Sequence, residues 1–308
     1  MLYGAHLPVI DFGEGVPALP ELKAYAREAE QLGYETLTVN DHLVFTRPWL
    51  DGPTALAAVL GETERIKLGT SVALPVVRGP VSLAKSLGAI DLLSGGRLTI
   101  GVGPGSSARD YAAVGIDFDE RWKRLDEAIE VIRALFRGED PPSGRFYRVD
   151  GLKLEPGPVQ SGGPPIWIGS WGSEAGLRRV VRLGDGWLAS GYNTNPATFA
   201  TAWADLRKQL AAAGRPTEGF PNGIATMWTF VSDDKSAAHH LLRDVLAPML
   251  KRDPDDLEPL LTIGSPEDCA ERLSAYASAG AQRVFIWPLT NPVRQLSTFM
   301  ERVAPLVR

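Results

Sequence analysis

Cysteine is nearly absent from this chain of 308 residues. A single cysteine, Cys269, excludes an internal disulfide and a metal cluster built from several thiolates. Histidine is also rare, with four residues, and Ala5-His6-Leu7 lacks the His-x-His pattern of metal-dependent barrel hydrolases. We therefore predict that the protein has no metal site.

Long runs of one kind of residue are missing as well. There is no basic cluster and the formal net charge is −5, which argues against nucleic acid and anionic membranes as partners. No apolar run reaches membrane-spanning length, and the N-terminus lacks the basic start and apolar stretch of a secretory signal. We predict a cytoplasmic protein that acts on a small-molecule substrate.

Two kinds of apolar segment alternate along the chain. Short apolar runs, typical of strands buried on both faces, are followed by segments with helical spacing. The expected strands are residues 3–10, 36–40, 66–74, 97–102, 165–169, 184–189, 224–231 and 283–287. Eight strands, each followed by a helix, predict the α/β class and a (β/α)8 TIM barrel, as one domain over residues 1–308.

Two segments depart from this alternation. Residues 138–165 are rich in glycine and proline and lie between the fourth main helix and the fifth strand. Asp150-Gly151 within them is a two-residue hairpin signal, so we expect a hairpin insertion across the barrel mouth. Residues 235–265 are expected to form an irregular helical segment, interrupted at Pro248 and Pro254.

A glycine-rich loop follows the fourth strand. Gly103-Pro104-Gly105-Ser106-Ser107 has almost no side chains before the serines, and a barrel binds its ligand at the carboxyl ends of its strands. The dinucleotide fingerprint G-x-G-x-x-G does not fit, because Ser106 stands where its third glycine belongs. A tight turn without a ligand remains the alternative.

His42 is the best single candidate for chemistry. It follows the second strand, and an imidazole titrates near neutral pH, which suits proton transfer. A histidine bonded to a loop carbonyl is the equal alternative, and Asp41 beside it either orients a ligand or caps a turn. We place His6 in the core and give little weight to His239 and His240.

The segment Gly169-Ser170-Trp171-Gly172-Ser173 opens a helix with small residues and hydroxyls. Free backbone N–H groups and the helix dipole at such a position bind phosphate, and an ordinary serine N-cap is the alternative. Four tryptophans fall at or near strand ends, and a cluster of them would suit a flat aromatic ring: Trp171, Trp187, Trp228 and Trp287.

An ordered set of short motifs runs through the whole chain. They are Asp41-His42, Leu68-Gly-Thr-Ser-Val72, Asp91-x-x-Ser-Gly-Gly-Arg97, Gly101-Val-Gly-x-Gly105, Asp119-Glu-Arg121, Pro164-Pro-Ile-x-Ile-Gly169 and Gly184-Asp-Gly-Trp187. Each alone is weak, but together they resemble the bacterial luciferase-like family of flavin- and deazaflavin-dependent oxidoreductases.

The resemblance implies a cofactor site at the barrel mouth. The ring would lie against the third strand, where members often have a non-proline cis peptide, here Ser71-Val72. The cofactor phosphate would meet residues 170–173, and His42 would be the catalytic residue beside the reactive edge of the ring. The residues expected to bind the cofactor are Asp41, Ser71, Val72, Gly103, Gly105, Ser106, Gly169, Ser170, Trp171, Gly172 and Ser173.

The family uses two cofactors with different chemistry. The Gly69-Thr70-Ser71-Val72 segment is similar to that of deazaflavin members, which favours hydride transfer between the deazaflavin coenzyme F420 and a small organic substrate. An FMN-dependent monooxygenase with a separate flavin reductase is the first alternative, and a non-catalytic flavin-binding protein the second. The resemblance also implies a homodimer.

Two positions depart from known members. Deazaflavin sugar-phosphate dehydrogenases carry a glutamate where this chain has Ser106, which argues against a glucose-6-phosphate type of activity. Luciferase itself has an arginine where Pro104 stands, so its phosphate contacts are not expected here.

Overall fold

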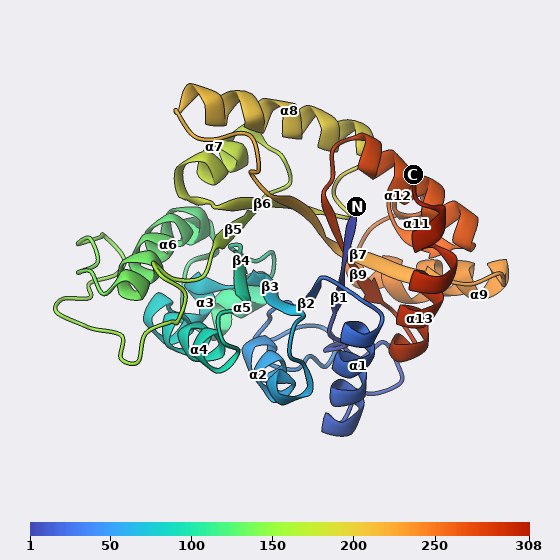
Figure 1. Ribbon diagram of the computed structural model, residues 1–308, viewed down its shortest axis with the longest axis horizontal. Coiled ribbons are helices and arrows are strands. Elements are labelled where there is room, and N and C mark those ends of the chain that lie inside the picture. The colour runs from blue at the N-terminus through green and yellow to red at the C-terminus, as the bar shows by residue number, and fades with distance from the viewer.

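The computed structural model describes all 308 residues, and at its centre eight parallel strands form a closed ring (Figure 1). Around the ring the order is β1, β2, β3, β4, β5, β6, β7 and β9, and β9 pairs with β1 to close it. The strands are β1 (Leu2–His6), β2 (Thr36–Val39), β3 (Lys67–Ala73), β4 (Leu98–Val102), β5 (Ile166–Gly169), β6 (Gly186–Ser190), β7 (Asn222–Val231) and β9 (Arg283–Pro288). The predicted (β/α)8 barrel is confirmed.

Helices cover the outside of the ring (Figure 1). The α-helices are α1 (Leu19–Gln31), α2 (Gly52–Ala58), α3 (Pro75–Arg78), α4 (Pro80–Leu93), α5 (Ala108–Ala113), α6 (Arg121–Arg137), α7 (Glu174–Leu183), α8 (Pro196–Ala212), α9 (Lys235–His240), α10 (Ala247–Leu250), α11 (Pro254–Leu257), α12 (Pro266–Ser278) and α13 (Pro292–Arg302). Short 3₁₀ turns cover Leu60–Glu62, Phe118–Glu120 and Ala304–Leu306, and a π-helical turn covers Leu241–Leu246. None of these helices combines the length and the apolar character that crossing a membrane requires.

Local sequence explains how β4 enters the ring. Gly95 and Gly96, with φ of 69° and 85°, turn the chain from the end of α4 into β4, in a conformation that other residues resist. Leu98 and Ile100 of β4 are fully buried. At Gly101 a Cβ atom would stand 2.2 Å from the carbonyl oxygen of Thr70, so only glycine lets β3 and β4 approach this closely.

The chain between β7 and α12 contains a strand that the sequence pattern did not reveal. Residues 235–265 are irregular and helical up to α11, and the expected interruption at Pro248 is wrong, because the helical run continues through it to Leu250 and breaks only before Pro254. They end, however, in β8 (Thr262–Gly264), which pairs with the far end of β7 outside the closed ring. Three residues are too short a run to be distinguished from helix by periodicity.

The expected hairpin across the barrel mouth is wrong. Residues 138–165 contain no strand and extend along the outside of the molecule beside α6 (Figure 1). The backbone N–H groups of Phe146 and Tyr147 donate to the carboxylate of Glu127 on α6, at 2.6–3.0 Å.

Farther along the same segment, the N–H groups of Val159 and Gln160 donate to the carboxylate of Asp91 on α4. Side-chain acceptors on two helices thus replace hairpin pairing.

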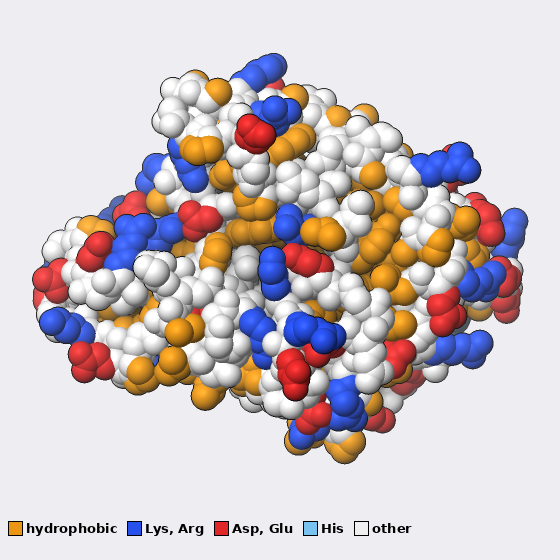
Figure 2. All heavy atoms as spheres, viewed as in Figure 1, with side chains coloured by type: hydrophobic (Ala, Val, Ile, Leu, Met, Phe, Trp, Pro, Cys, Tyr) orange, Lys and Arg blue, Asp and Glu red, His pale blue; other side chains and the backbone are white.

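Charged side chains of both signs are interspersed over the face in Figure 2, and neither sign dominates it. This even distribution accompanies the small formal net charge of −5. A face of this kind exerts little long-range attraction on a partner of either charge.

Candidate active site

The predicted ring-binding residues meet at the carboxyl ends of three neighbouring strands. A Cβ atom added to Gly103 would lie 2.9 Å from Val72, and one added to Gly169 would lie 3.1 Å from it. The ends of β3, β4 and β5 therefore share one surface, on which Val72 is half-buried and the two glycines present only backbone. A side chain at either glycine would press against Val72 and displace it.

The peptide bond between Ser71 and Val72 is cis, as the resemblance implied. The pairing of β3 with β4 also shifts register between Thr70 and Ala73, so the chain bulges there. Ser71 is buried, and its hydroxyl has no hydrogen-bond partner within the protein. Such a group calls for a partner, because buried polar atoms are rarely left unpaired.

The predicted phosphate loop lies beside this surface, between β5 and α7. The hydroxyl of Ser170 accepts from the N–H of Gly172 at 3.2 Å, and that of Ser173 accepts from the N–H of Gly176 at 3.2 Å. Ser173 is thus an N-cap, as the alternative expectation had it. The same turn still presents the first N–H groups of α7, which have no partner inside the helix and attract anions.

His42 contacts a residue that the sequence did not single out. Its Nδ1 lies 2.6 Å from Oδ2 of Asp110 on α5. The other oxygen, Oδ1, accepts from the N–H groups of Leu43 and Val44 at 2.9 and 2.8 Å. Asp110 is almost fully buried, with 1% of its side chain exposed, whereas 11% of the His42 side chain is exposed. The alternative of a histidine bonded to a loop carbonyl is excluded for Nδ1.

Aromatic rings hold the imidazole of His42 on its other sides. The rings of Phe45 and Trp49 each lie 4.6 Å from it, centre to centre. Nε2 of His42 makes no hydrogen bond within the protein and is not among the buried unpaired atoms, so it remains accessible. The site therefore contains one accessible imidazole nitrogen in a mostly aromatic setting.

Comparison with known proteins identifies the family of the chain. The model of the luciferase-like monooxygenase family matches residues 6–254. The chain belongs to this family.

Several proteins that are similar to this chain in sequence or in fold carry the names of oxidoreductases. The F420-dependent hydroxymycolic acid dehydrogenase of Mycobacterium tuberculosis is 34% identical over 70% of this chain, which spans 61% of that relative's length. The F420-dependent glucose-6-phosphate dehydrogenase of Nocardia farcinica is 29% identical and covers 94% of both chains. A solved structure of an F420-dependent secondary alcohol dehydrogenase with an F420–acetone adduct superposes with a TM-score of 0.86 at 17% identity, over 100% of this chain and 99% of that one. The last similarity concerns the fold alone.

Unpaired polar atoms of this luciferase-like protein gather at the same end of the barrel. Of nine buried side-chain atoms without a partner, six belong to residues at or just beyond the carboxyl ends of strands or in contact with them. They are His6 Nε2, Asn40 Oδ1, Trp49 Nε1, Ser71 Oγ, Trp228 Nε1 and Trp287 Nε1. This concentration, together with the bare surface at Gly103 and Gly169, fits a site for a flat heterocyclic group.

Asp41 is the predicted cofactor residue with the most clearly structural setting. Both carboxylate oxygens accept from the guanidinium of Arg78 at 2.6 Å, and 2% of the side chain is exposed. Arg78 also pairs with Asp51, the N-cap of α2. Burial lowers the pKa of Arg78, but its bonds to the carboxylates of Asp41 and Asp51 raise that pKa by a larger amount. The net shift is therefore upward. Asp41 thus anchors the loop that carries His42.

The remaining predicted cofactor residues are spread over the rim. Gly105 has a φ of 76°, which explains a glycine at that turn, and Ser106 beside it is exposed. Gly172 also has a positive φ, of 86°. Trp171 is 63% exposed, so it stands clear of the core.

The four tryptophans do not form one cluster. Trp228 and Trp287 stack at 4.0 Å, and His6 stacks on Trp287 at 3.6 Å. Trp187 instead packs against Phe199 of α8, outside the ring. Burial lowers the pKa of His6 to about 3, so this ring is neutral and buried, as expected for a core histidine.

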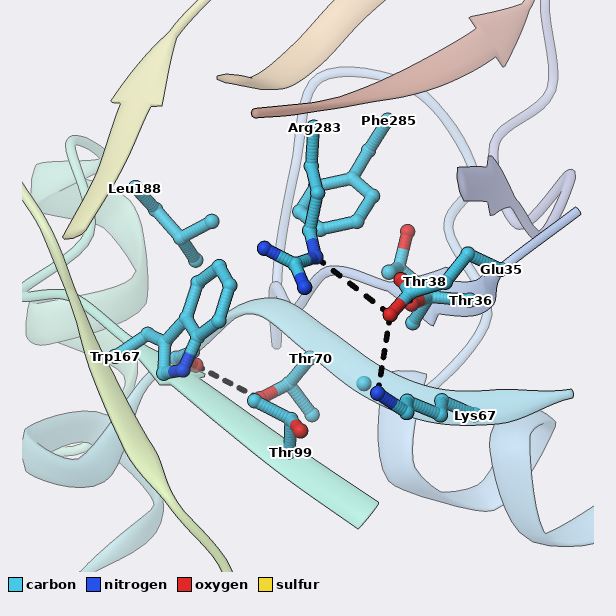
Figure 3. Close-up of a pocket in the computed structure, with 12 residues that line it drawn as sticks. Glu35, Thr36, Thr38, Lys67, Thr70, Thr99, Trp167, Leu188, Arg283 and Phe285 are labelled. Atoms are coloured by element: carbon cyan, nitrogen blue, oxygen red, sulfur yellow. Dashed lines mark hydrogen bonds and ion pairs between the residues drawn. The ribbon is translucent and has the colours of Figure 1, made fainter. Parts of the chain in front are cut away.

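A small cavity lies at the opposite end of the barrel and is not the candidate site (Figure 3). It measures about 50 Å³, and its lining includes charged residues at or beside the starts of β2, β3 and β9. Glu35 pairs there with Lys67 at 3.1 Å and with Arg283 at 3.6 Å (Figure 3). The amino ends of barrel strands contribute to stability, whereas catalysis belongs to the carboxyl ends.

Sequence reasoning missed Asp110, Phe45 and Trp49. One signal for Asp110 was present: Ser107 followed three residues later by an acid is a helix-start pattern, and Ser107 does cap α5. Nothing local indicated that this acid would contact His42, because the two residues are 68 positions apart.

Proposed function

We propose that this protein is an F420-dependent oxidoreductase that oxidises a small organic alcohol or reduces the matching carbonyl compound. The observation that supports it best is the convergence of an accessible imidazole nitrogen, a bare glycine surface and a helix N-terminus at one end of the barrel. The names of the curated relatives agree with this choice of cofactor.

The residues divide the work as follows. Val72, Gly103 and Gly169 would back the planar ring, and the unpaired hydroxyl of Ser71 would offer it a hydrogen bond. The hydroxyls and N–H groups of residues 170–173 would hold the phosphate. When bound, F420 supplies a carbon that takes up or gives a hydride.

His42 accepts or donates the proton of the same reaction. Oxidation of an alcohol removes a hydride from the carbon and a proton from the hydroxyl group, and the accessible Nε2 accepts that proton. In the reverse direction Nε2 returns the proton to the carbonyl oxygen. The aromatic rings of Phe45 and Trp49 limit the water around this nitrogen.

An FMN-dependent monooxygenase is the second candidate, because the matching family is described as luciferase-like monooxygenase. That chemistry would require a separate reductase to supply reduced flavin. A homodimer and a cytoplasmic location also remain predictions for this protein. Ser106 is exposed at the loop where sugar-phosphate dehydrogenases carry a glutamate, so we do not extend the proposal to glucose 6-phosphate.

Equilibrium titration separates the two cofactors. Purified protein freed of cofactor is titrated with F420 and, separately, with FMN, and binding is followed by the fluorescence of either ligand. We expect F420 to bind at least ~10-fold more tightly, equal to about 1.4 kcal/mol. Tight FMN binding without F420 binding would reject the proposal and favour the monooxygenase. Reduction of bound F420 by a panel of primary and secondary alcohols then tests the direction of hydride transfer.

A further inference from the structure

Asp110 contacts His42 through Nδ1 and leaves the accessible Nε2 without a partner. All contacts of its carboxylate are with donors: Nδ1 of His42 on one oxygen, and the N–H groups of Leu43 and Val44 on the other. A carboxylate can only accept in such contacts, so Nδ1 must carry the proton. The neutral imidazole then has its free lone pair on Nε2.

The carboxylate is itself held from several directions. Asp110 lies in the first turn of α5, and its own N–H donates to the hydroxyl of Ser107, the N-cap, at 3.4 Å. With 1% of the side chain exposed, water does not compete for these bonds. The two backbone donors fix which oxygen faces the loop, and this leaves Oδ2 for the imidazole.

From this geometry we infer that Asp110 is the positioning residue of the reaction. It fixes the His42 tautomer in which Nδ1 is protonated and Nε2 is the proton acceptor, and it stabilises the imidazolium that forms after the transfer. The inference rests on the proposed function for its catalytic consequence. The tautomer itself is a property of the protein without any cofactor.

Asp110→Asn is the sharpest test, because it keeps the shape and inverts the hydrogen bond. The backbone donors of Leu43 and Val44 still require an acceptor, so the amide oxygen must take the place of Oδ1. The amide nitrogen then faces Nδ1 of His42 and donates to it, which moves the proton to Nε2. Nε2 can no longer accept a proton from the substrate.

A surface pair in the same chain provides a matched control. Nδ1 of His240 lies 2.7 Å from Oδ2 of Asp244, but both side chains are about two-thirds exposed, at 65% and 64%. Asp244→Asn makes the same chemical change where water can replace the lost bond. We expect it to leave turnover unchanged.

The primary readout is the ¹⁵N spectrum of the histidine rings in mildly alkaline buffer. With four histidines in the chain the spectrum is simple, and His42→Ala identifies the signal of interest. We expect a protonated Nδ1 and an unprotonated Nε2 for His42 in the wild type, and the reverse in Asp110→Asn. A wild-type His42 protonated on Nε2 would overturn the inference even if the variant failed to fold.

Turnover of F420 with the alcohols of the panel is the second readout. In Asp110→Asn we expect kcat to fall by about 10²–10⁴-fold, the range for loss of a general base, with F420 affinity within about 3-fold of wild type. A reversed tautomer with unchanged kcat would also overturn the inference. If the wild type reduces no F420 at all, the proposed function fails, and the spectrum still decides whether Asp110 sets the tautomer.

Discussion

Replacing Gly176 by alanine probes the proposed phosphate loop with a single methyl group. The added Cβ would stand 2.1 Å from the hydroxyl oxygen of Ser170, and 3.1 Å from the Cβ of Ser170 and the hydroxyl of Ser173. Carbon and oxygen normally keep at least ~3.2 Å apart, so the Ser170 hydroxyl must move by about 1 Å. Its bond from the N–H of Gly172 is lost, together with its place beside the phosphate.

The effect on folding and the effect on binding differ in size. Alanine favours the helical conformation over glycine by roughly 1 kcal/mol, while the clash costs about 1–3 kcal/mol, so stability falls by at most about 2 kcal/mol. A hydrogen bond to a charged group contributes about 1.5–3 kcal/mol. Losing one from Ser170 to the phosphate weakens F420 binding by about 10- to 10²-fold.

Titration with F420 measures this change, and Gly61→Ala is the matched control. Gly61 has open space around its Cβ position and no positive φ, so the same substitution there leaves affinity unchanged. The deazaflavin riboside without the phosphate tail serves as a second ligand, and its affinity should be equal in wild type and Gly176→Ala. A folded Gly176→Ala protein that binds F420 as tightly as wild type would refute the phosphate loop. Equal losses for both ligands would place the effect elsewhere.

Three further outcomes follow from the structure. Arg78→Met leaves the buried carboxylate of Asp41, whose side chain is 2% exposed, without its guanidinium partner. The free energy of unfolding measured in urea should therefore fall by about 3–5 kcal/mol. A loss below ~1 kcal/mol would contradict the anchoring role. Burial raises the pKa of Glu35, but the hydroxyl of Thr36 and the charges of Arg283 and Lys67 together lower it below its ordinary 4.5. A lowered folded-state pKa contributes stability above pH 4.5 that is lost as the pH falls through the folded value, so Glu35→Gln should lose less stability on acidification than wild type; parallel curves would contradict this. His42→Ala should reduce kcat by about 10²–10⁴-fold with little change in F420 affinity, and an unaltered kcat removes the residue from the mechanism.

Local patterns were enough to predict the barrel. Each strand is a short apolar run and each covering helix repeats its apolar residues with helical spacing, and both signals lie within one element. The cap at Ser173 was visible for the same reason, since a serine N-cap acts on a backbone N–H only three residues farther along. The cis bond at Ser71-Val72, by contrast, was anticipated through family resemblance and not through any local pattern.

The errors share a physical cause. Asp150-Gly151 is a good turn signal, but a hairpin also needs its backbone N–H groups to pair with a neighbouring strand. In the folded protein Glu127, from a helix 19 positions earlier, accepts from Phe146 instead. The three residues of β8 are likewise defined by their pairing with β7 and not by their own composition.

The sequence by itself therefore determined the order of strands and helices, the bare loops at the strand ends and the candidacy of His42, because these depend on neighbours along the chain. Only the tertiary structure decided what each side chain touches. It placed Trp187 against Phe199 of α8 and Trp287 against His6 and Trp228, although both tryptophans follow similar strand patterns. It also brought Asp110 to His42 across 68 positions, because closure of the barrel sets the two loops side by side and sequence spacing carries no record of that contact.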